Sequence, residues 1–122
     1  MKLNLNQIKQ AYRKIEREQG IKPVTGQYTA HRVTGEVYGA CPLAAVAYAS
    51  GMDILEIAFC GMRNQAAIFS ACGGLSMDEA TNFRRGFNGL LPYKEDRDDP
   101  GLQAYYLLGV ETAKSFLLTV RH

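Results

Sequence analysis

Metal-binding and redox side chains are scarce in this sequence, whose 122 residues include no tryptophan, two histidines and three cysteines. Cys41, Cys60 and Cys72 show neither the CxxC nor the CxxH spacing of zinc sites, so we expect neither a metal ion nor a cofactor. An odd number of cysteines is typical of reduced thiols, and the start of the chain lacks the apolar stretch of a secretory signal. These absences predict a cytoplasmic protein.

Long apolar runs and catalytic motifs are missing as well. The longest stretch without a charged residue, 37–52, has 16 residues and contains Pro42, whereas a membrane-spanning helix needs about 20 apolar residues. Neither the phosphate-loop patterns GxGxxG and GxxxxGKS/T nor the hydrolase and protease motifs GxSxG and HExxH occur. We therefore expect no contact with a membrane, and we favour a non-enzymatic protein.

The net charge of +2 is too small to imply nucleic acid by itself, but the charge is unevenly distributed. The first 22 residues carry six basic and two acidic side chains, whereas the segment Glu95–Asp99 contains four acids. A basic N-terminal helix and this acidic loop could attract each other, within one subunit or between subunits. Two solvated faces are the simpler interpretation.

What the sequence does contain is a series of helix signals. Apolar residues recur at spacings of three and four from Leu5 to Ile15, which predicts a helix over residues 5–19 with Asn4 as its N-cap and Gly20 as its stop. Similar signals predict further helices that begin near residues 42, 54, 65, 77 and 100, the last of which extends to about residue 118.

The fold class follows from the order of these elements. β-branched and aromatic residues around Thr34 predict a short β-hairpin between the first helix and the central helix. The central helix, which begins at Pro42, is apolar on every side, so we expect it to be buried. The sequence therefore predicts a mainly α fold: a compact helical bundle of five to six helices that forms a single domain over residues 1–122.

The start of the central helix carries the thiol of greatest chemical interest. With Pro42 in the first helical position, Cys41 falls at the N-cap, where free N–H groups and the helix dipole favour a thiolate. His31 could approach Cys41 across the hairpin, so one hypothesis is thiol chemistry at these two residues. The alternatives are a small buried side chain that closes the hairpin onto the helix, and a Cys-Pro ligand for haem.

Arginines suggest a surface that binds nucleic acid or nucleotide phosphate. Arg84 and Arg85 stand in the last turn of a predicted helix, Arg63 precedes another, and Arg13 and Arg17 lie on the exposed face of the first. No RNA- or DNA-recognition motif accompanies them. The favourable interaction of cations with a helix C-terminus explains the adjacent pair equally well.

The last predicted helix is apolar on more than one face, which suggests contact with another subunit. Tyr105, Tyr106 and Leu108 are the residues that we expect at such an interface. A dimer formed there would offer a groove in which a peptide or small molecule could bind.

Short segments of the chain show a resemblance. Gly39–Ala45, Leu75–Ala80, Arg85–Gly89 and Tyr106–Gly109 resemble elements of a set of small bacterial and phage proteins of no established activity. Those proteins carry cysteine where Ala40 stands and aspartate where Asn88 stands. The resemblance implies a compact helical fold and a phage or mobile-element origin, and it implies no catalytic residue. The framework of that fold would include Cys41, Pro42, Gly86, Phe87 and Gly89.

Three functions remain open on the sequence alone. The first is a small regulatory or interaction protein that forms a homo-oligomer and binds a protein or a small molecule. The second is a nucleic-acid or nucleotide-phosphate binder that uses the arginines and the basic first helix. The third is a protein with thiol chemistry at Cys41.

Overall fold

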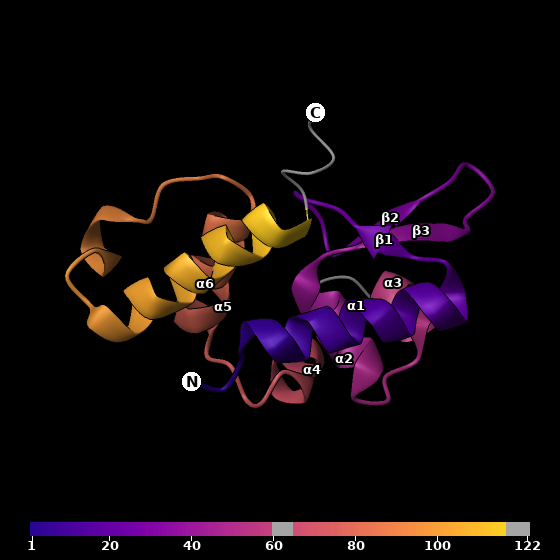
Figure 1. Cartoon of the computed structure of the whole chain (residues 1–122), viewed down its shortest axis with the longest axis horizontal. Helices are drawn as coiled ribbons and strands as arrows, with labels where there is room; N and C mark the ends of the chain where they lie inside the picture. Colours follow the sequence, from indigo (N-terminus) through magenta and orange to yellow (C-terminus); the bar gives the residue numbers. More distant parts are fainter. Residues whose placement is uncertain (60–64, 117–122) are drawn as a thin grey trace. The chain divides into compact units, whose positions relative to one another are not determined.

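The computed structural model describes residues 1–59 and 65–116, and Figure 1 shows their course. The described residues are mainly helical with a small sheet, as the sequence predicts. None of the helices among them combines the length and the apolar character needed to cross a membrane. The elements are, in chain order, α1 (Leu5–Gln19), β1 (Lys22–Pro23), β2 (Thr29–His31), β3 (Val37–Ala40), α2 (Pro42–Ala49), α3 (Ile54–Phe59), α4 (Gln65–Ala71), α5 (Met77–Phe87), the 3-10 turn η2 (Lys94–Asp96) and α6 (Pro100–Phe116).

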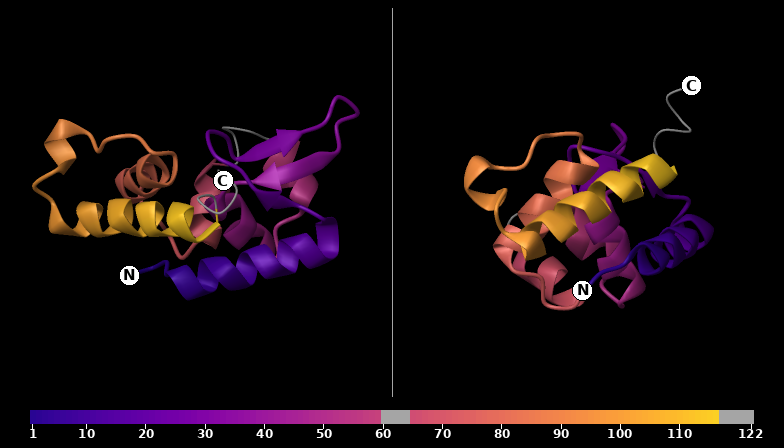
Figure 2. Two further views of the ribbon diagram at one scale, coloured as in Figure 1. Left: turned by 45° about the horizontal axis from the view of Figure 1, so that its top comes forward. Right: turned by 60° about the vertical axis from the view of Figure 1, so that its left-hand side comes forward.

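The chain divides into two compact units, residues 1–74 (unit 1) and residues 75–122 (unit 2). Unit 1 contains α1 to α4 and the sheet, and unit 2 contains α5, η2 and α6. Figure 2 shows these elements from two further directions. Each unit is described by itself below, and a single domain over residues 1–122 stays a prediction.

α1 forms as its sequence predicts. The Asn4 side chain accepts a hydrogen bond from the Gln7 backbone N–H at 2.8 Å. Gly20 ends the helix with a φ of 68°, a left-handed conformation that costs glycine less than other residues. Ile8 and Ile15 lie on the buried stripe, so the apolar periodicity identified the correct face.

The sheet contains the predicted hairpin and one additional strand. β2 and β3 pair antiparallel, with Ala30 opposite Gly39, which confirms the hairpin. β1 pairs in parallel with β3, and the strand order is β1-β3-β2. This two-residue strand ends at Pro23, which has no N–H to donate, and the next backbone N–H, that of Val24, donates to the Ala40 carbonyl at 3.1 Å.

α2 is the buried centre of unit 1. Each residue from 43 to 47 exposes at most 1 % of its surface. α2 packs against α1, α3, α4 and β3, which are grouped around it in Figure 1. Its alanines let these neighbours approach closely, so the predicted role of this helix is confirmed.

Unit 2 is built on the contact between α5 and α6. The predicted capping box begins α5: the Glu79 backbone N–H donates to Ser76 Oγ at 3.1 Å, and the Ser76 N–H donates to the Glu79 carboxylate at 2.8 Å. The two helices then cross at glycines. A Cβ atom on Gly86 would overlap the Tyr106 carbonyl oxygen, and one on Gly109 would overlap the α5 backbone, so glycine permits contact between the two backbones.

Two amide side chains, one on α5 and one on α6, hold η2 in unit 2. Asn82 is fully buried, and its Nδ2 donates to the Asp78 carbonyl at 2.9 Å and to the Asp96 carboxylate at 3.1 Å. Gln103 Nε2 donates to the Asp96 carbonyl at 2.8 Å. These bonds hold Asp96 from α5 on one side and from α6 on the other.

Candidate functional site

Cys41 lies at the N-cap of α2 with Pro42 in the first helical position, as the sequence predicts, but it is buried. Cys41 exposes 4 % of its surface, its thiol makes no capping hydrogen bond, and its backbone N–H donates to the Tyr28 carbonyl at 2.8 Å. His31 pairs with Val37, four residues before Cys41, and its Nε2 lies 3.0 Å from Thr29 Oγ1. The pairing of His31 with Cys41 stays a hypothesis.

Two further buried groups surround the start of α2. Tyr12 donates its hydroxyl to the Ala40 carbonyl at 2.9 Å, and Cys72 donates its thiol to the Leu43 carbonyl at 3.4 Å. Burial, and secondly the nearby Cys41 sulfur, raises the pKa of Tyr12 well above its ordinary value and raises the pKa of Cys72 to about 12. The cluster therefore favours protonated, structural side chains. Thiol chemistry at Cys41 stays a hypothesis.

The candidate arginines that the structure describes belong to two different units. Arg13 and Arg17 lie exposed on α1 in unit 1, and Arg84 and Arg85 lie on α5 in unit 2. Arg63 lies outside the described residues.

Arg85 has a structural role in unit 2. Its Nε donates to the Leu91 carbonyl at 2.6 Å, and its guanidinium lies 4.1 Å from the centre of the Tyr93 ring. These contacts hold the loop that follows α5, so the Arg85 side chain already has partners within its own unit. Nucleic-acid binding stays a prediction.

The residues proposed for a subunit interface on α6 lie mostly inside unit 2. Tyr105 and Leu108 are buried, and Tyr106 is half-buried and donates its hydroxyl to the Leu90 carbonyl at 2.8 Å. Most of the apolar surface of α6 therefore packs against α5 and the loop that follows it. Leu107 is the large apolar side chain of α6 that stays exposed, at 62 %.

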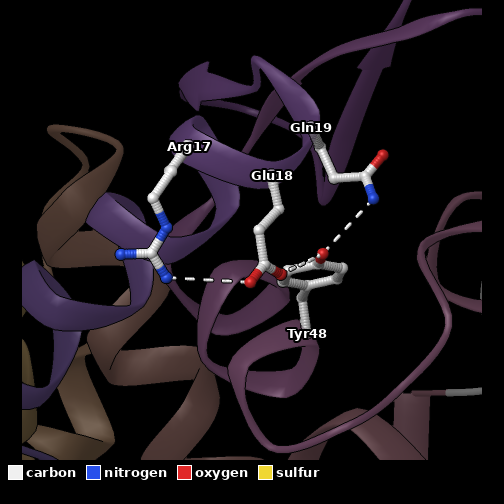
Figure 3. A network of polar contacts seen from close by, with 4 residues as sticks. All are labelled: Arg17, Glu18, Gln19 and Tyr48. Carbon is white, nitrogen blue, oxygen red and sulfur yellow. Dashed lines mark hydrogen bonds and ion pairs between the residues drawn. The ribbon is translucent and has the colours of Figure 1, made fainter.

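A polar network joins the end of α1 to the end of α2, as Figure 3 shows. The Tyr48 hydroxyl donates to the Glu18 carboxylate at 2.7 Å, Gln19 Nε2 donates to the Tyr48 oxygen at 3.3 Å, and Arg17 forms an ion pair with Glu18 at 3.7 Å. The Tyr48 hydrogen bond lowers the pKa of Glu18, and the same bond raises the pKa of Tyr48. The network is exposed to solvent, so its charges are screened.

Two large apolar side chains of α3 are exposed, beside the exposed acid Glu56. Ile57 is the buried residue of this helix, whereas Leu55 and Phe59 expose 58 % and 60 % of their surfaces. The Phe59 ring lies 5.1 Å from the His31 ring, so the hairpin borders this surface. We call the exposed pair Leu55 and Phe59 the α3 surface.

A hollow opens beside one end of the α3 surface. It has a volume of about 230 Å³. Apolar side chains form much of its lining, and polar groups stand among them. The lining residues are Gln19, Ile21, Gly35, Glu36, Val37, Ile54 and Leu55.

This surface was not among the sites that the sequence predicted, although a signal for it exists. Four of the six residues of α3 are large and apolar, which is more than one face of a short helix buries. Among the residues that the structure describes, no group of three histidine, cysteine or acidic side chains converges on a point that could hold a metal ion.

The comparisons with known proteins return nothing for this chain: no family model, no curated protein and no solved structure matches it.

Proposed function

We propose that this chain is a protein-interaction module that associates with a second copy of itself through the α3 surface. The observation that supports the proposal is a protruding aromatic side chain and an open hollow at opposite ends of one short helix. Phe59 ends α3, and Ile54 and Leu55, which line the hollow, begin it.

The spacing along α3 suits a two-fold contact. Leu55 and Phe59 are four residues apart, so they lie on one face and about 6 Å apart along the axis. When two such helices meet antiparallel, each Phe59 faces the beginning of the other α3 and therefore the other hollow. A contact of this kind uses the same patch on both copies and closes at two subunits.

The size of the hollow is compatible with an aromatic ring. A cavity of about 150 Å³ in another protein accommodates benzene, and this hollow has about 230 Å³. Fully burying a phenylalanine side chain contributes about 1.5–3 kcal/mol, and Phe59 is already partly covered. Because association also has an entropic cost, we expect the dimer to be weak.

Sedimentation equilibrium tests the proposal, with Phe59→Ser compared against Leu107→Ser. Both substitutions remove one exposed apolar side chain of similar exposure, one from α3 and one from α6. We expect the wild type and Leu107→Ser to dimerise and Phe59→Ser to remain monomeric. If only Leu107→Ser lost the dimer, the interface would lie on α6 and not on α3. If the wild type stayed monomeric up to about 1 mM, self-association would be rejected.

A mixing experiment tests the pairing of ring and hollow. Leu55→Arg obstructs the hollow but leaves Phe59, whereas Phe59→Ser removes the ring but leaves the hollow. Neither variant is expected to dimerise alone. An equimolar mixture retains one of the two contacts, so we expect partial recovery of the dimer, and no recovery would contradict the antiparallel arrangement. Because the contact is apolar, association should persist as salt is raised, unlike phosphate binding by arginines.

A further inference from the structure

A histidine stands beside the aromatic ring of the α3 surface. The His31 ring lies 5.1 Å from the Phe59 ring, so a contact that buries Phe59 would also bring His31 close to the second copy. His31 is exposed, and its Nε2 lies 3.0 Å from Thr29 Oγ1. A hydroxyl can accept a hydrogen bond from a neutral or a protonated ring, so His31 can gain a proton and keep its place.

Acidic side chains surround the α3 surface. The Asp53 carboxylate accepts a hydrogen bond from the Leu55 backbone N–H at 2.9 Å, where α3 begins, and Glu56 is exposed on the same helix. Glu36 is one of the residues that line the hollow. We call Glu36, Asp53 and Glu56 the acidic border.

Arg32, on the hairpin, compensates one of these acids. Its Nε lies 3.8 Å from the Glu36 carboxylate, and its guanidinium lies 5.3 Å from the centre of the Tyr38 ring on β3. One guanidinium can balance one carboxylate. Arg32 and the three residues of the acidic border therefore have a net negative charge while His31 is neutral.

A two-fold contact places this negative charge against an identical copy of itself. Like charges that face one another disfavour association. Histidine is the side chain that ordinarily gains its charge between about pH 8 and pH 5. A proton on each His31 would lower the negative charge of both surfaces at once. The imidazolium beside Phe59 would also approach Glu36, which lines the hollow of the other copy.

We propose that protonation of His31 strengthens self-association through the α3 surface, so that the dimer becomes more stable as the pH falls. This inference rests on the proposed function, because it concerns the regulation of the same contact. The dimer binds the His31 proton more tightly than the monomer does. Association is therefore strongest at low pH and weakens as the pH rises through the range in which imidazole titrates.

Sedimentation equilibrium at pH 8 and at pH 5.5, at equal and low ionic strength, tests the proposal. Because exposed charges interact weakly, we expect the Kd of the wild-type dimer to be only about fivefold lower at the acidic pH. His31→Gln can still form a hydrogen bond with Thr29 but gains no charge, so it should have the same Kd at both pH values. His122→Gln is the matched control, because the chain has two histidines, and it should respond to pH as the wild type does.

A carboxylate variant tests the same repulsion from the other side. Glu56→Gln removes one negative charge from each copy without changing the size of the side chain. We expect this variant to dimerise about twofold to fivefold more tightly than the wild type at pH 8. Raising the salt concentration should reduce the difference between the two pH values, because salt screens exposed charges.

The outcomes separate this inference from the proposed function. A dimer that depends on Phe59 but does not become tighter at pH 5.5 would overturn the inference and leave the α3 contact in place. A pH response that persists in His31→Gln, or an unchanged Kd in Glu56→Gln at pH 8, would do the same. A wild type that stays monomeric at both pH values would overturn both.

Discussion

The two units of this protein bury their helices in different ways. In unit 1 the other elements surround α2, a helix rich in alanine. The core of this unit is made by side chains from several elements. Unit 2 has two long helices whose backbones meet at Gly86 and Gly109, with Asn82 fixing the adjoining turn. Unit 1 therefore has many contacts that share the energy of folding, whereas unit 2 depends on a few positions at which little change is possible.

The largest effect is expected at the crossing of the helices in unit 2. Gly86→Ala places a methyl group against the α6 backbone, which cannot rotate away as a side chain can, so we expect a loss of at least about 3 kcal/mol in the free energy of unfolding. Urea denaturation measures the loss. Gly101→Ala is the control, because the nearest atom to its new methyl group belongs to the Asp99 side chain, at 3.3 Å.

The control variant should be about as stable as the wild type, because the higher helix propensity of alanine offsets the small shift that the Asp99 side chain must make. Equal stability of the two variants would contradict a backbone contact. Amide spectra of Gly86→Ala also sharpen the comparison between the units. If signals from unit 1 persist while those of unit 2 collapse, the units fold separately; their joint loss would support the single domain that the sequence predicts.

The second effect, of intermediate size, concerns alkaline pH and unit 1. An exposed thiol has a pKa of about 8.5, whereas burial and then Cys41 raise the pKa of Cys72 to about 12. The unfolded chain therefore loses this proton first, and stability, complete below about pH 8.5, decreases as the pH rises towards 12. From Cys72 alone we expect a loss of about 2 kcal/mol at pH 10.

Urea denaturation between pH 7 and pH 10 measures this slope. Cys72→Ala lacks the thiol, so it should lose stability at neutral pH through the missing contacts but show a smaller decrease towards pH 10. An unchanged slope would show that the thiol is not protonated in the folded protein at pH 10. The Tyr12 hydroxyl adds a further alkaline loss at higher pH, because its pKa is also raised by burial.

The sequence predicted what depends on neighbouring residues. Asn4 and Ser76 cap their helices, Cys41 and Pro42 begin α2, and the hairpin forms around the expected turn. Each of these features depends on side chains that reach the backbone two or three residues away, or on local backbone geometry. That information is present in any short window of the chain.

What the sequence did not predict depends on contacts between distant segments. The apolar pattern of α6 indicated that more than one face is covered, but not that α5 and its loop cover Tyr105, Tyr106 and Leu108. The close approach at Gly86 and Gly109 and the pairing of β1 with β3 have the same origin. The hollow beside α3 has no local pattern either, because it is lined by segments far apart in the chain.

The smallest effect on stability is expected at the exposed network at the ends of α1 and α2. Tyr48→Phe removes the donor whose hydrogen bond is the main cause of the lowered pKa of Glu18, so NMR titration should show that pKa rising towards its ordinary value. A carboxyl with a lowered pKa stabilises the fold above its unfolded pKa, and that contribution is lost as the pH falls through the folded value. Here the group is exposed to solvent and its charge is screened, so we expect the thermal midpoint to be unchanged. A marked decrease in the midpoint would show that unit 1, like unit 2, depends on a few positions.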